Sequence, residues 1–209
     1  EVKKFGADTV KMYLAFMGPY GELTNYPWDL GGIAGIRRFL ERVCGLKEHV
    51  NETGAEETTK LLHETIKKVR EDIVSFKFNT AISALMILVN KIERSSLTLD
   101  EYHTVLKLLA PFAPHLCEEL WQEAGNEGSI HETAYPDFNP VLAEKTEFTI
   151  GVQINGKVRG SITINKNTTQ EEAVKLALAT PGVSEKLSGQ KIKREIYVPG
   201  KILNLIVAD

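Results

Sequence analysis

Cysteine is scarce in this chain of 209 residues, and long apolar runs are absent. The two cysteines, Cys44 and Cys117, lie far apart in segments with helical periodicity, which excludes a disulfide framework and favours small core residues in a reducing compartment. No apolar run approaches the roughly 20 residues that a membrane-spanning helix needs, and the N-terminus has no signal-peptide pattern. We therefore expect a cytoplasmic protein without a membrane partner.

The sequence also lacks the motifs that announce catalysis. It contains no Gly-x-Gly-x-x-Gly, no P-loop, no His-Glu-x-x-His and no cysteine pair at metal-ligand spacing. His115 and Glu119 would share one face of a helix, but the neighbouring Leu116, Leu120 and Trp121 favour a structural histidine. We predict no catalytic residue, no cofactor-binding residue and no metal site in this chain.

Charge is divided unevenly along the chain. Residues 148–209 hold nine Lys/Arg and five Asp/Glu, a net charge of +4, which leaves 16 against 23, or −7, for the residues before them. A basic segment joined to an acidic one suggests a polyanionic partner for the basic segment. Solvated surface lysines would give the same count.

The first two thirds of the sequence have helical periodicity. Apolar residues recur every three or four positions in five segments, with an N-cap residue expected before three of them. The predicted helices are 1–18, 30–50, 57–76, one capped by Asn79 and one opened by the capping box Thr98–Glu101; Asp29 is expected to cap the second. Such helices with short loops predict a bundle.

An apolar corner with two prolines, Leu108–Trp121, lies at the centre of this bundle. Pro111 and Pro114 lack an N–H and disfavour helix in the residue before them. One helix should therefore end before the corner and another begin near Pro114, with the corner itself buried.

The last 60 or so residues change to a period of two. Alternating apolar residues predict a hairpin around Asn155-Gly156, then a helix opened by Thr168 and Glu171, then strands at 192–198 and 202–207. A single helix covers only one face of such a ββαββ sheet. Side chains of polar parity should face outward on the other: Gln153, Arg159, Lys193 and Tyr197. That face suits RNA, or an ordinary solvated surface.

These patterns divide the chain into four parts. The predicted fold class is multidomain α plus α/β, with a helical bundle followed by a small two-layer ββαββ domain. The expected boundaries are 1–28 for a helix and connection, 29–130 for the bundle, 131–147 for a linker and 148–209 for the α/β domain. Because Glu1 falls inside an amphipathic helix, we also expect a fragment of a longer chain.

Several stretches resemble the C-terminal part of bacterial-type leucine–tRNA ligases (leucyl-tRNA synthetases). Helical motifs that are shared with the valine, isoleucine and methionine enzymes are Lys4–Val10, Phe16–Pro19, Gly35–Leu40, Phe78–Ile82 and Leu109–Trp121. Two tail motifs are similar to the leucine enzymes in particular: VQINGKVRG at 152–160 and IYVPGKILNL at 196–205.

The resemblance implies an anticodon-binding-type bundle and a terminal tRNA-binding domain. The implied partners are tRNA(Leu) and the upstream catalytic and editing domains of the same chain, and we expect a monomer. The parent would use ATP with Mg²⁺ to leucylate tRNA. The loops for that chemistry are absent here, so the fragment alone should be inactive and hold no cofactor.

Exposed cations are the candidate tRNA contacts, because phosphates dominate nucleic-acid affinity. The predicted residues are Lys157, Arg159, Lys193, Arg194 and Lys201 in the tail, with Arg37, Arg38 and Arg42 in the bundle. The alternative is a protein–protein scaffold, in which the bundle offers a groove and the tail adds an edge strand to a partner. A basic sheet face favours RNA, whereas a more apolar one favours protein.

Overall fold

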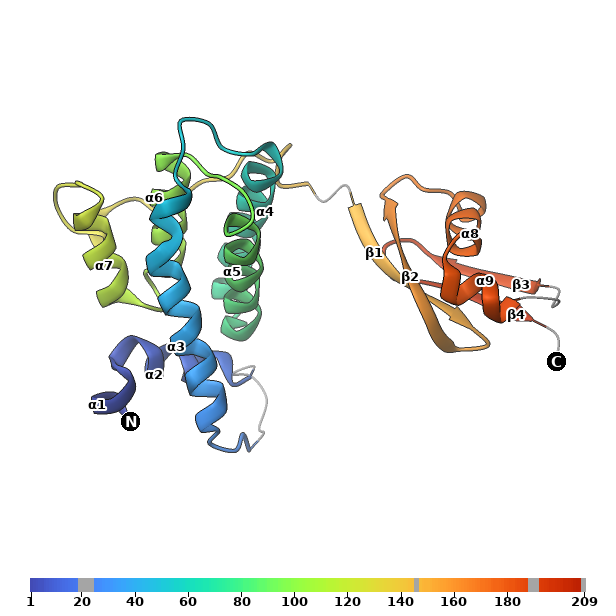
Figure 1. Cartoon of the computed structure of the whole chain (residues 1–209), viewed down its shortest axis with the longest axis horizontal. Coiled ribbons are helices and arrows are strands. Elements are labelled where there is room, and N and C mark those ends of the chain that lie inside the picture. Colours follow the sequence, from blue (N-terminus) through green and yellow to red (C-terminus); the bar gives the residue numbers. More distant parts are fainter. Residues whose placement is uncertain (19–24, 145–146, 188–191, 208–209) are drawn as a thin grey trace. The chain divides into compact units, whose positions relative to one another are not determined.

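The computed structural model separates into two compact units, Glu1–Glu144 and Lys145–Asp209, which are called the helical unit and the α/β unit below (Figure 1). The structure describes residues 1–18, 25–144, 147–187 and 192–207. Part of the predicted connection before the bundle, 19–24, and part of the predicted linker, 145–146, lie outside the described residues. The predicted fold class, helical followed by a small α/β domain, is confirmed.

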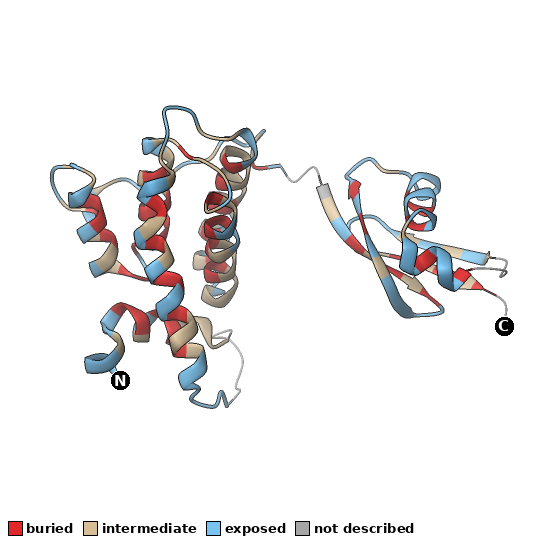
Figure 2. Ribbon diagram, in the orientation of Figure 1, coloured by how far each residue is buried: buried red, intermediate tan, exposed pale blue. Residues whose placement is uncertain are grey.

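The helical unit holds short helices at its start and longer ones around a single core. Its elements are α1 (Val2–Phe5), α2 (Ala7–Phe16), α3 (Leu30–Cys44), η1 (Gly45–His49), α4 (Glu56–Val74), α5 (Phe78–Ile92), α6 (Leu99–Leu109), α7 (Pro114–Glu123) and η2 (Ile130–Glu132). Buried residues line the facing sides of the helices (Figure 2). The predicted first helix is divided in two at Gly6, whose φ of 88° a side chain would disfavour.

The double-proline corner behaves as predicted. Helix α6 ends at Leu109 and α7 begins with Pro114 at its first position, so the missing N–H costs no intrahelical bond. Between them Phe112 and Ala113 are buried, and the Phe112 ring meets the edge of Phe78 at a centroid distance of 6.3 Å. The corner therefore joins the last two helices to the core that α5 helps to build.

Two of the three helix caps predicted for the helical unit are confirmed. The Asp29 carboxylate accepts from the N–H groups of Gly31 and Gly32, and Thr98 with Glu101 forms the expected capping box. Asn79 does not cap α5, which already begins at Phe78. Only residues 75–77 separate α4 from α5, so Lys77 takes the N-cap position and Asn79 already lies inside the helix.

The predicted linker, 131–147, is for the most part packed on the helical unit. Arg70 of α4 donates to the Pro136 carbonyl at 2.6 Å and lies over the rings of Tyr135 and Phe138, 5.7 and 5.4 Å from their centroids. Burial raises the pKa of Tyr135 to about 12. The absence of periodicity indicated irregular backbone, and irregular backbone can still pack through its aromatic side chains.

The α/β unit is a four-stranded sheet with two helices on one face. Its elements are β1 (Glu147–Ile154), β2 (Lys157–Asn165), α8 (Gln170–Leu178), α9 (Pro181–Leu187), β3 (Ile192–Val198) and β4 (Ile202–Val207). The strand order is β2-β1-β4-β3, in which β1 and β4 are parallel and the outer pairings antiparallel. Short α9 was not predicted as a separate helix. The capping box of α8 uses Thr169 and Glu172, one residue later than expected.

The hairpin turn between β1 and β2 was predicted correctly. Asn155 and Gly156 have φ of 47° and 79°, the two positive values that a type I′ turn requires.

Among the described residues, no helix is long and apolar enough to cross a membrane.

Gly156→Ala tests the turn. A side chain forced onto a left-handed φ should destabilise the α/β unit by about 1–2 kcal/mol, seen as faster amide hydrogen exchange in β1 and β2. Both tryptophans lie in the helical unit, so the unfolding midpoint from tryptophan fluorescence should not move.

Gly151→Ala is the matched control. Gly151 has no positive φ, and an added Cβ would meet no heavy atom within 4 Å. Equal acceleration of exchange in both variants would show that the left-handed turn is not the cause.

Candidate nucleic-acid interface

All five predicted cations of the α/β unit are exposed at turns, bulges or an edge of the sheet. Lys157 follows the hairpin turn, and Lys201 lies in the turn between β3 and β4. Arg159 and Lys193 each occupy the extra position of a β-bulge, and Arg194 lies beside Ile206 of β4. Within the described part of the chain, none of the five forms an ion pair. Their charges are therefore available to an external anion.

The bulges overturn part of the predicted sheet face. The bulge at Lys193 shifts the parity of β3, so Tyr197 pairs with buried Leu203 and lies on the face that the helices cover. The Tyr197 hydroxyl donates to the Thr168 carbonyl at 3.0 Å. The prediction that Tyr197 faces outward is wrong, whereas Gln153, between buried neighbours in β1, faces outward as predicted.

The arginines of α3 are mostly engaged within the helical unit. Arg37 pairs with Glu41 at 2.8 Å, and Arg42 donates from Nε to Glu93 Oε1 at 2.7 Å. The hydrogen bonding between Arg42 and Glu93 raises the pKa of Arg42 and lowers the pKa of Glu93. Arg38 is exposed, and among the described residues it has no ion-pair partner. The expected basic ridge is therefore largely neutralised, because Glu41 of the same helix pairs with Arg37 and Glu93, just after α5, pairs with Arg42.

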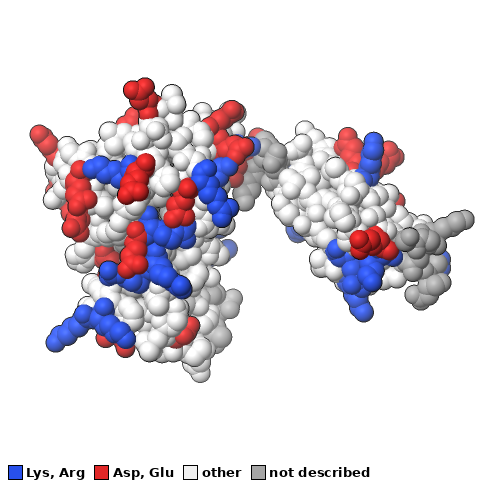
Figure 3. Space-filling model, viewed as in Figure 1, with Lys and Arg blue, Asp and Glu red and all other residues white. Residues whose placement is uncertain are grey.

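Basic and acidic side chains also interleave over the face of the helical unit that Figure 3 shows. Such a face gives a phosphate backbone no continuous positive track. Of the predicted cations, those of the α/β unit are the better placed to bind a polyanion.

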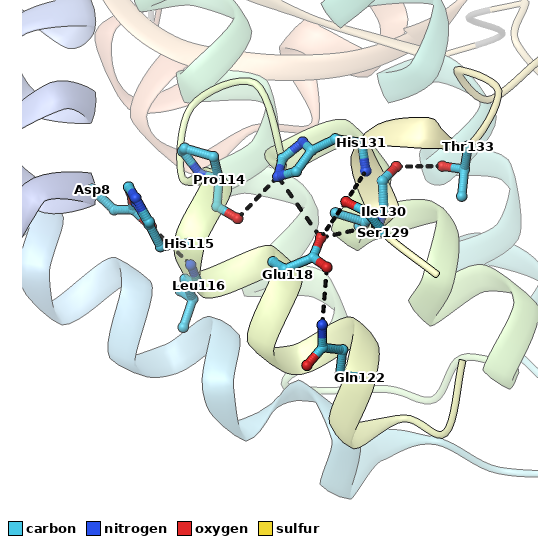
Figure 4. Close-up of polar contacts among 10 residues, drawn as sticks. All are labelled: Asp8, Pro114, His115, Leu116, Glu118, Gln122, Ser129, Ile130, His131 and Thr133. Carbon is cyan, nitrogen blue, oxygen red and sulfur yellow. Dashed lines mark hydrogen bonds and ion pairs between the residues drawn. The ribbon is translucent and has the colours of Figure 1, made fainter. Parts of the chain in front are cut away.

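A buried carboxylate joins α2 to α7 (Figure 4). Asp8 accepts from the Leu116 N–H at 2.8 Å and from His115 Nδ1 at 2.7 Å. Helix α7 has no capping side chain of its own, so Asp8 satisfies its first turn from more than a hundred residues away. His115 is thus a structural partner of Asp8, and sequence reasoning gave no sign of which carboxylate it would meet.

An open cavity of about 390 Å³ lies beside this contact and includes Asp8, His115 and Cys44 in its lining. The Cys44 thiol donates to the Leu40 carbonyl, and although Cys44 lies at the surface, partial desolvation raises the pKa of its thiol. A thiol held protonated is a poor nucleophile and a poor metal ligand. Among the described residues, no group of three His, Cys, Asp or Glu could hold a metal ion.

Glu118 of α7 holds the segment that follows it (Figure 4). Its Oε2 accepts from the Ser129 hydroxyl at 2.9 Å and the Ile130 N–H at 3.1 Å, while Oε1 accepts from Gln122 at 3.0 Å. The Ser129 hydrogen bond is the main reason that the pKa of Glu118 is lowered. His131 Nε2 lies 3.9 Å from the same carboxylate. This network fixes the start of η2 on α7.

Comparison with known proteins places these features in a family. Residues 56–175 match the family model described as the anticodon-binding domain of tRNA ligase. The chain is 41% identical to the leucine–tRNA ligase of Prosthecochloris aestuarii over 99% of this chain and 26% of that protein. It is 42% identical to that of Bdellovibrio bacteriovorus over 98% and 26%. The chain thus spans about a quarter of these relatives.

A solved structure gives the same result. The chain resembles one chain of the ternary complex of the Agrobacterium radiobacter K84 agnB2 LeuRS with tRNA and LeuAMS. The TM-score is 0.68 at 33% identity, over 100% of this chain and 30% of that one.

Asp8→Ala tests the contact between α2 and α7. Loss of a buried capping carboxylate should destabilise the helical unit by about 1–3 kcal/mol, lowering the denaturant midpoint of tryptophan fluorescence. Glu57→Ala removes an exposed surface pair with Lys91 and should lower the midpoint much less, because solvent screens such a pair. Equal losses in the two variants would contradict the assigned role of Asp8.

Glu118 predicts a pH dependence. Its folded pKa lies below the ordinary value of 4.5, so its hydrogen bonds stabilise the fold above pH 4.5 and are lost as pH falls through the folded pKa. The thermal unfolding midpoint of the helical unit should therefore fall less steeply below pH 4.5 in Glu118→Gln than in the wild type. Parallel curves in a thermal melt series would refute this role.

Proposed function

The chain belongs to the family of anticodon-binding domains of tRNA ligases, and from this we propose that it is the tRNA-binding part of a leucine–tRNA ligase. The proposal assigns it to positioning tRNA(Leu) while other parts of the parent protein leucylate and edit it. The main support is similarity to leucine–tRNA ligases along 99% of the chain, through both units.

The unequal availability of the cations supports a division of labour. The α/β unit would supply phosphate contacts through Lys157, Arg159, Lys193, Arg194 and Lys201, all exposed. In the helical unit Arg38 is the better candidate, because Arg37 and Arg42 already meet carboxylates. Phosphate contacts give affinity and register, while folded RNA is distinguished by its shape and unpaired bases.

Catalysis is assigned to residues beyond this chain. The parent would use ATP and Mg²⁺ in its catalytic domain, and the present chain alone should neither activate leucine nor charge tRNA. It would act in the cytoplasm as part of a monomeric enzyme. Incubation of the isolated chain with ATP, leucine and tRNA should give no aminoacylation.

The salt dependence of tRNA binding tests the function. In titrations of the 209-residue chain with a leucine tRNA transcript and a non-cognate transcript, log K should fall linearly with log salt for the leucine tRNA. Arg194→Gln should reduce the magnitude of that slope by roughly 0.7–0.9, the share of one phosphate contact.

Arg42→Gln is the matched control, since it removes a cation that Glu93 already neutralises. Its slope should equal that of the wild type. Absence of salt-dependent binding in the wild-type chain would overturn the proposed function.

A further inference from the structure

The end of helix α7 is joined to α6 through one side-chain amide. Helix α7 ends in a Schellman motif, in which Gly125 has a φ of 86° and the Asn126 N–H donates to the Trp121 carbonyl at 3.4 Å. The side chain of Asn126 adds a second donor to that carbonyl, from Nδ2 at 3.0 Å. The same Nδ2 lies 3.0 Å from Nε2 of His103 in α6. One amide nitrogen thus holds the loop after α7 against two helices.

These contacts determine which way the amide points and which proton His103 carries. The Trp121 carbonyl can only accept, so the nitrogen of the Asn126 amide, and not its oxygen, has to face it. The second hydrogen of that nitrogen then points at His103, whose Nε2 has to accept. The imidazole is therefore neutral, with its proton on Nδ1.

A charged His103 is incompatible with both contacts of the amide. Protonation of Nε2 would place its N–H against the N–H of Asn126. If the amide turned by half a rotation, its oxygen could accept from the charged ring but would face the carbonyl oxygen of Trp121. In either orientation one of the two contacts is lost, so the loop is held fully only by the neutral ring.

The surroundings of the ring also favour its neutral form. Burial is the main reason that the pKa of His103 lies below its ordinary value of 6.5, and Lys107 lowers it further, while Asp100 opposes both effects. The Lys107 ammonium lies 5.2 Å from the centroid of the Trp121 ring, which lies 5.0 Å from that of His103. A proton on His103 would thus bring a second cation to this cluster.

Tyr102 and two acids also lie near this contact along the chain. The Tyr102 ring is 6.2 Å from that of His103, and burial raises the pKa of Tyr102 to about 12, so it stays neutral wherever a histidine titrates. Glu123 and Glu127, which flank Asn126 in sequence, are exposed, and solvent screens exposed charges. The state of His103 is therefore the main variable of the contact near neutral pH.

We propose that the contact between His103 and Asn126 is a proton-sensitive latch, closed when the ring is neutral and open when it is charged. The latch is independent of the proposed function. Because the folded pKa of His103 lies below the unfolded value of 6.5, the latch stabilises the fold fully above pH 6.5. That contribution is lost as the pH falls through the folded pKa.

The segment after α7 should then open in two steps. Its start, 125–128, is held by the latch and opens first. Its end is held by Glu118, which accepts from Ser129 and from the Ile130 N–H and whose pKa lies below 4.5. Between the two titrations the start of the segment would be free while its end remains on α7.

NMR titration of the imidazole groups in the 209-residue chain tests the latch. His103 should titrate below pH 6.5, and its neutral form should carry the proton on Nδ1. Asn126→Ala removes the donor that favours the neutral ring, so the pKa of His103 should rise. Asn126→Asp should raise it further, because a carboxylate would pair with the charged ring. Glu127→Gln is the matched control, since it changes an exposed charge next to the amide and should leave that pKa nearly unaltered.

Hydrogen exchange measures the opening itself. After correction for the intrinsic pH dependence of exchange, the amides of 125–128 in the wild type should exchange roughly two- to tenfold faster once His103 is charged, which is the worth of one hydrogen bond. Those of 129–130 should change only below pH 4.5. In Asn126→Ala, 125–128 should exchange fast on both sides of the His103 titration, while tryptophan fluorescence verifies that the helical unit remains folded.

Two results would overturn the latch. One is an equal pKa of His103 in the wild type and Asn126→Ala, or a shift of the same size in Glu127→Gln, because surface charge and not the amide would then set the state of the ring. The other is exchange of 125–128 in the wild type that does not respond to the titration of His103.

Discussion

The helical unit depends on a carboxylate that serves a helix far away in the sequence. Helix α7 starts at a proline corner where no neighbouring side chain can accept its first N–H groups, and Asp8 supplies the acceptor from α2. A charge with 11% side-chain exposure is tolerable only because it accepts from both Leu116 and His115. The same contact fixes the N-terminal helices on the bundle. Core packing of Met12 and Tyr13 and this cap together hold α2 in place.

Local patterns predicted most of the fold, and they failed where a distant residue decides the outcome. The helix that starts at Pro114, the Asn155-Gly156 turn and the capping box at Thr98 depend on a few neighbouring residues, and each was predicted. Helical periodicity does not reveal that Glu93 neutralises Arg42. Irregular sequence likewise cannot show that a proline-rich segment packs on α4.

The candidate surface was predicted in composition but not in geometry. Counting charges correctly found a basic tail, and its five candidate cations are all exposed. Strict alternation then put Tyr197 on the wrong face, because one extra residue in a strand reverses every later side chain. A bulge leaves little trace in sequence, since it changes pairing and not composition. Only the register showed that Ile196 and Val198 lie on the sheet face that the helices leave uncovered.

The bulges also explain how one small sheet combines two kinds of surface. Regular alternation across four strands with two helices on one side leaves a single free face, which holds Arg194 beside Ile206 as well as apolar side chains. Bulged positions lie outside the alternation, so Arg159 and Lys193 can border that face without being part of it. The two register shifts thus let exposed cations and regular alternation coexist in one four-stranded sheet.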